Sequence, residues 1–146
     1  MRRRGLVYWT DRALGAHILP NILRNNRVQV VRHVETFPDD DRIADLDWIP
    51  EIASRGWIIV TKDAQIRRNR IEREMLIACG ALYVSLGKGN LTGEQQAERF
   101  LRHRATLDAF FAGASRGPHI LSARLDDVHR LDGERWEVVP RVRRYR

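Results

Sequence analysis

A chain of 146 residues with 43% hydrophobic side chains is long enough to bury the core of one domain. Its apolar runs fall short of the roughly 18 residues that a membrane-spanning helix requires, so we expect no association with a membrane. The net charge of +7 indicates a polyanionic partner such as nucleic acid, although nearly all the positive charge is arginine, which a base-composition bias in the gene would also enrich.

The N-terminal segment and the cysteine content bear on the compartment. The basic start MRRRGLVYW suits a signal peptide, but Thr10, Asp11 and Arg12 interrupt the apolar stretch and no cleavage-site pattern follows. The single cysteine, Cys79, cannot form an internal disulfide, which fits a reducing environment. We therefore expect a cytoplasmic protein.

Strands alternate with helices over the first 60 residues. Apolar runs predict strands over residues 5–9, 28–34 and 57–61, and the last of these is apolar throughout, as in a strand covered on both faces. A helix over about 14–23 starts or bends near Pro20. A second helix over 45–54 ends before Gly56.

The same alternation continues to residue 90 and then changes. A helix over 71–79, closed by Gly80, precedes a strand over 81–86 and a loop over 87–90. Thr92 and Gln95 form a capping box at the start of the longest predicted helix, which runs to about residue 112. Two further strands are predicted over 120–124 and 136–139, on either side of a turn at Asp132 and Gly133.

This order of elements predicts an α/β fold with a mostly parallel central sheet, helices on both faces and a C-terminal strand pair. We expect a single domain over residues 1–146. It would comprise a core of about 5–90, the long helix of about 92–112, and C-terminal strands with an arginine-rich tail over about 118–146.

Four acidic residues stand where this fold would bring them together. Asp11 follows the first strand, Glu35 closes the second, Asp63 follows the third, and Asp45 opens the helix before the third strand. Because the carboxyl ends of parallel strands meet at one edge of a sheet, these carboxylates can converge in one cleft. Glu35 and His33 lie two residues apart on the predicted strand and would therefore share a face.

Converging carboxylates repel one another unless a cation lies between them. Mg²⁺ prefers oxygen ligands and is usually held by one or two carboxylates together with a substrate phosphate. There it can polarise a phosphoryl oxygen and activate a water molecule for hydrolysis. No Cys/His spacing suggests zinc, and neither a P-loop nor a nucleophile elbow is present.

Each acidic residue also has a simpler interpretation. Asp11 and Asp63 could be helix N-caps or could form Asx-turns. Asp47 shares the first turn of its predicted helix with Asp45, where carboxylates favour the helix dipole. A metal ligand and a hydrogen-bonding residue at the rim are equally consistent with Glu35.

Several segments resemble the PIN-like nucleases, and most closely the branch of VapC45-type toxins. The segments are YWTDRALG, HVETF, DLDW and RGWIIVTKD, and the match covers roughly residues 6–90. The segment GPHILSARLDDVHRL resembles the terminal strand pair of that branch. The resemblance implies a PIN-type fold, Mg²⁺- or Mn²⁺-dependent cleavage of RNA, and a role as the toxin of a type II toxin–antitoxin pair.

The resemblance also implies partners and site residues. RNA and a cognate antitoxin protein would be the partners, and PIN-like proteins commonly form homodimers. By position, Asp11, Asp45 and Asp63 match the acidic residues that bind the metal and carry catalysis, and Glu35 and Asp47 are the candidates for a fourth acid.

Basic and hydroxyl side chains near these acids could receive the RNA, although a solvated, charge-balanced surface explains any one of the arginines equally well. The candidates for substrate binding are Arg12, Thr61, Lys62, Arg67, Arg68, Arg70 and Arg73. Two alternative functions remain, and a neighbouring gene for a small DNA-binding antitoxin would favour the toxin over the first of them. One is a housekeeping RNA-processing or DNA-directed nuclease of the same fold. The other is a non-catalytic module that binds nucleic acid or an antitoxin.

Overall fold

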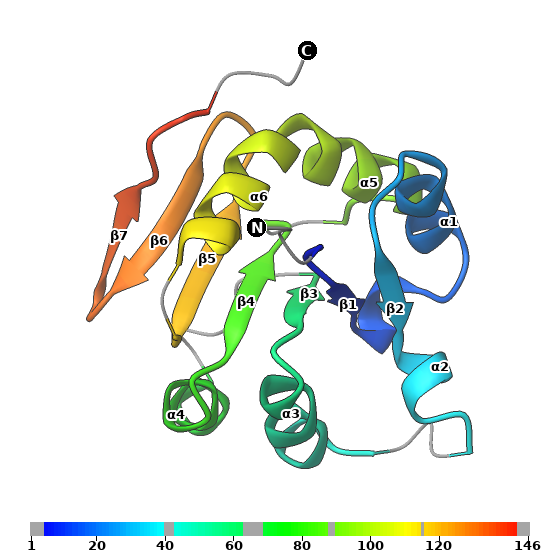
Figure 1. Ribbon diagram of the computed structural model, residues 1–146, viewed down its shortest axis with the longest axis horizontal. Coiled ribbons are helices and arrows are strands. Elements are labelled where there is room, and N and C mark those ends of the chain that lie inside the picture. Colours follow the sequence, from blue (N-terminus) through cyan, green and yellow to red (C-terminus); the bar gives the residue numbers. More distant parts are fainter. Residues whose placement is uncertain (1–4, 40–42, 63–68, 88–89, 115, 143–146) are drawn as a thin grey trace.

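The computed structural model describes residues 5–39, 43–62, 69–87, 90–114 and 116–142 of the chain. Its strands form one continuous sheet in the order β2-β1-β3-β4-β5-β6-β7 (Figure 1). The strands are β1 (Tyr8–Thr10), β2 (Val30–Arg32), β3 (Ile58–Thr61), β4 (Leu82–Ser85), β5 (His119–Ala123), β6 (Val128–Asp132) and β7 (Arg135–Val138).

Helices form the connections between the parallel strands. They are the 3-10 turn η1 (Arg12–Leu14) and the helices α1 (Ile18–Asn25), α2 (His33–Thr36), α3 (Asp45–Ser54), α4 (Arg70–Ala78), α5 (Gly93–Arg102) and α6 (Arg104–Gly113). Strands β2, β1, β3, β4 and β5 are parallel, whereas β6 and β7 extend the sheet in antiparallel fashion. The expected α/β architecture with a mostly parallel sheet is confirmed.

One face of the sheet packs against α1, α5 and α6 (Figure 1). Alternate strand residues such as Tyr8 and Val60 point to this side, where they meet Leu23 of α1 and Phe100 of α5. The rings of Tyr8 and Phe100 lie edge to face with centroids 4.9 Å apart. This arrangement is favourable for two aromatic side chains beyond the area that they bury.

The opposite face packs against α3 and α4 (Figure 1). Trp9 and Ile59, the strand residues next to Tyr8 and Ile58, point to this side and meet Trp48 of α3 and Leu76 of α4. All four side chains are essentially inaccessible to solvent. The sheet is therefore the middle layer of a three-layer sandwich, which accounts for the consecutive apolar residues Ile58, Ile59 and Val60 in β3.

The second strand is shorter than predicted. It ends at Arg32, and His33–Thr36 form the helix α2 instead of continuing the strand. The backbone N–H of Arg32 donates to Glu35 Oε1 over 2.8 Å, which starts the helix. The prediction that His33 and Glu35 share a strand face is wrong, because His33 is buried and Glu35 is exposed.

Two further predictions need correction. The single helix predicted over about 92–112 is two helices, α5 and α6, separated at His103. His103 has left the helical conformation (φ −102°, ψ 8°), and its Nε2 lies 2.6 Å from the carbonyl oxygen of Arg124. Strand β6 was not predicted, although the segment that resembles a terminal strand pair does form β5 and β6. In the described part of the chain, no helix is both long and apolar enough to cross a lipid bilayer.

Candidate active site

The candidate site lies where the direction of chain winding reverses. From β1 the chain crosses to β2 on one side, and later to β3 on the other side of β1. Open parallel sheets bind ligands at such switch points, beyond the carboxyl ends of the strands. Asp11 directly follows β1, and Thr61 is the last residue of β3.

The backbone and side chain of Asp11 are both tied to β3. Its N–H donates to the carbonyl oxygen of Val60 over 3.0 Å, which prolongs the pairing of β1 and β3 by one residue. The hydroxyl of Thr61 donates to Asp11 Oδ2 over 3.1 Å. Asp11 precedes the turn η1, yet its side chain makes no capping hydrogen bond there. The contact with β3 therefore positions the carboxylate.

Asp45 reaches the same place from the first turn of α3. One turn further along the helix lies Trp48, whose indole N–H donates to Asp45 Oδ1 over 3.0 Å. Trp48 is 2% exposed, and its ring packs on that of Trp9 with centroids 4.6 Å apart. The orientation of Asp45 is thus held by a side chain that is itself fixed in the core. The signal for this contact was the D-x-x-W spacing, because residues three apart on a helix are neighbours.

The pKa of Asp11 reflects its surroundings in the site. Burial raises the pKa of its carboxyl above the ordinary value, and the negative charge of Asp45 raises it further. The hydroxyl of Thr61 and the backbone amides of Ala13 and Arg12 lower the pKa, but only in part. Two carboxylates from different elements are therefore close enough to repel each other.

The described residues offer these two acids no cationic partner. No lysine or arginine among them forms an ion pair with Asp11 or Asp45. They also contain no group of three or more acidic, histidine or cysteine side chains that could hold a metal ion. Asp63, the third expected acid, lies outside the described residues. A pair of facing carboxylates with a hydroxyl beside them is nevertheless a donor set that suits a hard divalent cation.

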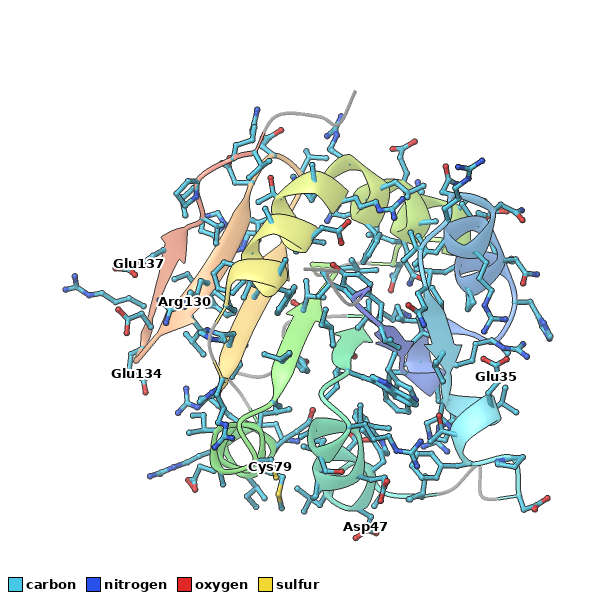
Figure 2. All side chains as sticks on the ribbon, in the orientation of Figure 1. Glu35, Asp47, Cys79, Arg130, Glu134 and Glu137 are labelled. Atoms are coloured by element: carbon cyan, nitrogen blue, oxygen red, sulfur yellow. The ribbon has the colours of Figure 1, made fainter. Side chains whose placement is uncertain are left out.

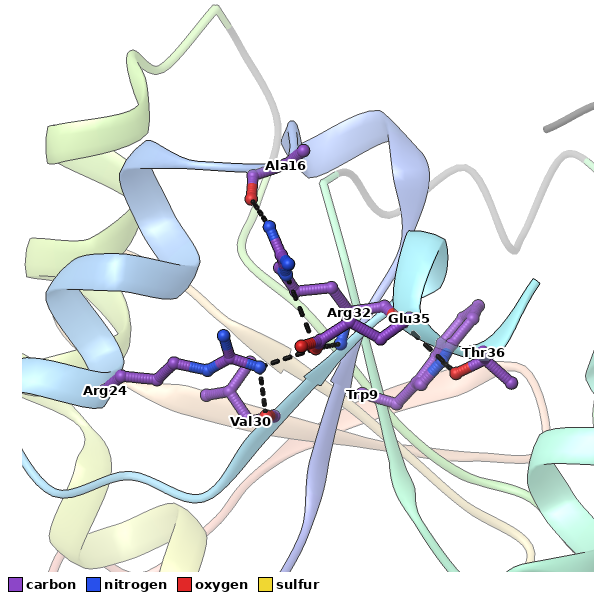
Figure 3. Close-up of polar contacts among 7 residues, drawn as sticks. All are labelled: Trp9, Ala16, Arg24, Val30, Arg32, Glu35 and Thr36. Carbon is purple, nitrogen blue, oxygen red and sulfur yellow. Dashed lines mark hydrogen bonds and ion pairs between the residues drawn. The ribbon is translucent and has the colours of Figure 1, made fainter. Parts of the chain in front are cut away.

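Glu35 lies in a separate network of ion pairs. Its carboxylate accepts from Arg24 Nη2 and from the backbone N–H of Arg32, and Arg32 Nε lies 3.4 Å away (Figure 3). Burial works to raise the pKa of Glu35, but these hydrogen bonds and the charge of Arg24 outweigh it, so the pKa is lowered. Its contacts in the described part of the chain are thus to arginines and not to Asp11 or Asp45.

Asp47 does not turn toward the sheet. It is exposed, and Figure 2 shows its side chain on the outer side of α3, pointing away from the rest of the protein. The structure therefore brings Asp11, Asp45 and Thr61 together, and places Glu35 and Asp47 elsewhere.

The basic candidates differ in their exposure and in their ion pairs with acidic side chains. Arg12 is exposed beside Asp11, and Lys62 is half-buried beside Thr61. Arg70 and Arg73 at the start of α4 pair with Glu74 at 3.1 Å and Glu134 at 3.4 Å. Arg67 and Arg68 lie outside the described residues.

Comparison with known proteins gives two matches. The family model described as "PIN like domain" matches residues 6–88. A protein of Mycobacterium tuberculosis (strain ATCC 25618 / H37Rv) with the name "Putative ribonuclease VapC45" is 31% identical over 127 residues, which is 84% of this chain and 89% of that protein. No solved structure matches the chain significantly.

Proposed function

The chain belongs to the PIN-like domain family, and from this we propose that it is a metal-dependent endoribonuclease, the toxin of a type II toxin–antitoxin pair. The observation that supports this proposal most strongly is the meeting of Asp11 and Asp45 at the switch point of the sheet, where the charge of Asp45 raises the pKa of Asp11. A protein without a use for this pair would gain stability by replacing one carboxylate. The name of the mycobacterial relative points in the same direction.

We propose that Asp11, Asp45 and Asp63 hold Mg²⁺ or Mn²⁺. Glu35 and Asp47, the other acidic candidates, lie elsewhere and are not part of this proposed site. When bound, the cation would neutralise the carboxylates, polarise a phosphoryl oxygen of the RNA and activate a water molecule for attack. The product ends would be a 5′-phosphate and a 3′-hydroxyl.

Other side chains would prepare this site without reacting. The Thr61 hydroxyl holds one oxygen of Asp11, and the Trp48 indole holds one oxygen of Asp45, so that each carboxylate would be kept in a fixed direction. Arg12, Lys62 and the basic residues Arg67, Arg68, Arg70 and Arg73 would attract and position the RNA backbone.

The proposal includes partners for the enzyme. A nuclease that cuts cytoplasmic RNA endangers the cell that makes it, and we propose that an antitoxin covers the site. A basic side chain of the antitoxin would interact with Asp11 and Asp45 and so compete with the cation. We further propose that the protein acts as a homodimer, as is common among PIN-like proteins.

The test of the activity is cleavage of RNA by purified protein with Mg²⁺, with Mn²⁺ and with EDTA. Wild type should cleave only in the presence of a divalent cation, and Asp11→Asn and Asp63→Asn should lose nearly all turnover while remaining folded. End-labelling of the products would identify the 5′-phosphate. Full activity of clean protein in EDTA would exclude the proposed chemistry.

The test of the toxin role is expression in a cell. Wild type alone should slow growth, whereas Asp63→Asn should be tolerated, and the inhibition of wild type by its antitoxin should weaken as Mg²⁺ rises. Harmless expression of a demonstrably active enzyme, with no small protein that co-purifies, would favour a housekeeping nuclease instead.

A further inference from the structure

A pocket opens directly beside the acid pair, between the turn that follows β1 and the helix α2. Its volume is about 120 Å³. Gly15 and Ala16 line one wall, Val34 and Phe37 line the other, and Asp11 belongs to the lining as well. The pocket and the candidate active site therefore share a residue.

The two walls of the pocket are tied together by Arg32. Its Nη1 donates to the carbonyl oxygen of Ala16 over 2.9 Å, and its Nε lies 3.4 Å from Glu35 on α2 (Figure 3). Arg24 pairs with the same carboxylate oxygen, Oε1 of Glu35. Because these contacts join η1, α1 and α2 within the protein itself, the pocket is formed before any ligand arrives.

One residue of the pocket lining carries a buried hydroxyl. Thr10 lines the pocket and is 1% exposed, and its Oγ1 has no hydrogen-bond partner among the described residues. A buried hydroxyl that lacks a partner destabilises the folded protein, and such a group is usually satisfied by a ligand or by water. The wall beside it is aromatic, since Phe37 packs on the ring of His33 with centroids 5.3 Å apart.

We propose that this pocket binds one nucleobase of the RNA, from a nucleotide next to the phosphate that is cut; this proposal rests on the proposed nuclease function. A base in single-stranded RNA offers two flat faces for stacking and a rim of donors and acceptors. Phe37 and Val34 contact its faces, and the Thr10 hydroxyl, whose side chain rotates toward the pocket when the base enters, binds its rim. Because Asp11 lines the pocket, a base bound there leaves its own phosphate beside Asp11 and Asp45.

An apolar side chain of a protein partner would suit this pocket less well than a base. It would fill the space between Val34 and Phe37 but would leave the Thr10 hydroxyl without a partner. The surroundings also favour an anion, because Arg12 lines the pocket and is exposed. The charge and the buried hydroxyl together therefore favour RNA.

The experiment scans a short, fluorescently labelled single-stranded RNA with one abasic site at each position in turn. Binding is measured by anisotropy in EDTA, so that the result does not depend on cleavage. For wild type, one position of the abasic site should weaken binding about tenfold, as expected for a lost stacking contact, and the others much less. In Ala16→Phe, whose added ring fills the pocket, intact and abasic RNA should bind equally.

Thr10→Val tests the hydroxyl alone. It should reduce the preference among the four bases at the sensitive position, and its thermal stability should equal or exceed that of wild type, because an unsatisfied group is removed. Two matched controls lie in α6. Thr106→Val removes a buried hydroxyl that accepts from the N–H of Val142, and Ala112→Phe adds a ring at another exposed alanine. Both controls should retain the wild-type dependence on the base.

The outcomes separate this proposal from the nuclease function. Two results would overturn the proposal that the pocket binds a base: equal binding of wild type to every abasic RNA, or the same dependence on the position of the abasic site in Ala16→Phe and Thr10→Val as in wild type. Either result would leave a protein partner as the occupant. Cleavage by wild type that is lost in Asp11→Asn decides the nuclease function whatever the scan shows. Position-dependent binding without cleavage would support the pocket and reject the nuclease.

Discussion

At the scale of single residues, Asp11 lies in an environment that disfavours the charged form of its carboxyl. Its pKa is raised by burial and by Asp45, so the folded protein binds a proton more readily than the unfolded chain does. Stability should consequently fall as pH rises from the ordinary carboxyl value through the raised value, and it should stay reduced above that range. This penalty should disappear when the charge of Asp11 is removed.

We therefore expect metal-free Asp11→Asn to melt at or above wild type at pH 7. The difference should shrink as the pH falls toward the ordinary carboxyl pKa of 3.8, because wild type then becomes protonated as well. Thermal melts in EDTA across this pH range would measure the effect. A mutant that is less stable by about 1 kcal/mol would instead indicate that Asp11 acts as an N-cap.

Trp48 is expected to act on the reaction only through Asp45. Trp48→Phe retains an aromatic core residue but loses the hydrogen bond to Asp45, and we expect a loss of about 10- to 100-fold in turnover, as for other residues that orient metal ligands. The same change should have little further effect in the Asp45→Asn background. A similar loss in both backgrounds, measured as kcat/KM, would show that the effect comes from packing.

At the scale of elements, helix α5 offers a test of local stability away from the site. The Thr92 hydroxyl accepts from the N–H of Gln95 over 3.1 Å, and Gln95 Oε1 accepts in return from the N–H of Thr92. Thr92→Ala should reduce the free energy of unfolding by about 1 kcal/mol. Thr92→Ser, which retains the hydroxyl, should have little effect in denaturant titrations. Turnover should not change in either variant.

The same capping box shows what could be predicted from sequence. Local signals placed α3, its stop before Gly56 and the start of α5 correctly, because caps and glycine turns are decided by neighbouring residues. The break at His103 carries no local signal, since it depends on a contact with Arg124, which is distant in the sequence. Strand β6 was missed because three of its five residues are polar, and it is recognisable only as the partner of β5.

In the candidate site, too, some features could be predicted from the sequence and others depend on contacts between distant residues. The spacing of strands predicted that Asp11 and Asp45 converge, and the structure brings them together. The position of Glu35 depends on Arg24 and Arg32, and the first of these lies on another helix, so no pattern around Glu35 itself could reveal the ion pairs. The pocket likewise combines two segments, on either side of α1, whose contact depends on the packing of the whole sheet.

At the scale of the whole molecule, the net charge of +7 should make RNA binding strongly dependent on salt. Replacing Arg67, Arg68 and Arg70 with Ala should flatten a plot of log affinity against log salt more than replacing Arg143, Arg144 and Arg146. The reason is that the first group directly follows Asp63 in the sequence, next to the proposed metal ligands. Equal flattening by both triple variants would mean that the charge acts only as a diffuse field.

The position of β1 between β2 and β3 also matters while the protein is being synthesised. The hydrogen bond between Asp11 and Thr61 joins residues that are 50 positions apart, and β1 acquires its second neighbour only when Ile58–Thr61 have been translated. Contacts between such distant parts of a chain form late, because a long loop must close first. A fragment that ends before this point lacks the strand that positions the Asp11 carboxylate. Under the proposed function, a chain that ends before β3 should therefore be inactive.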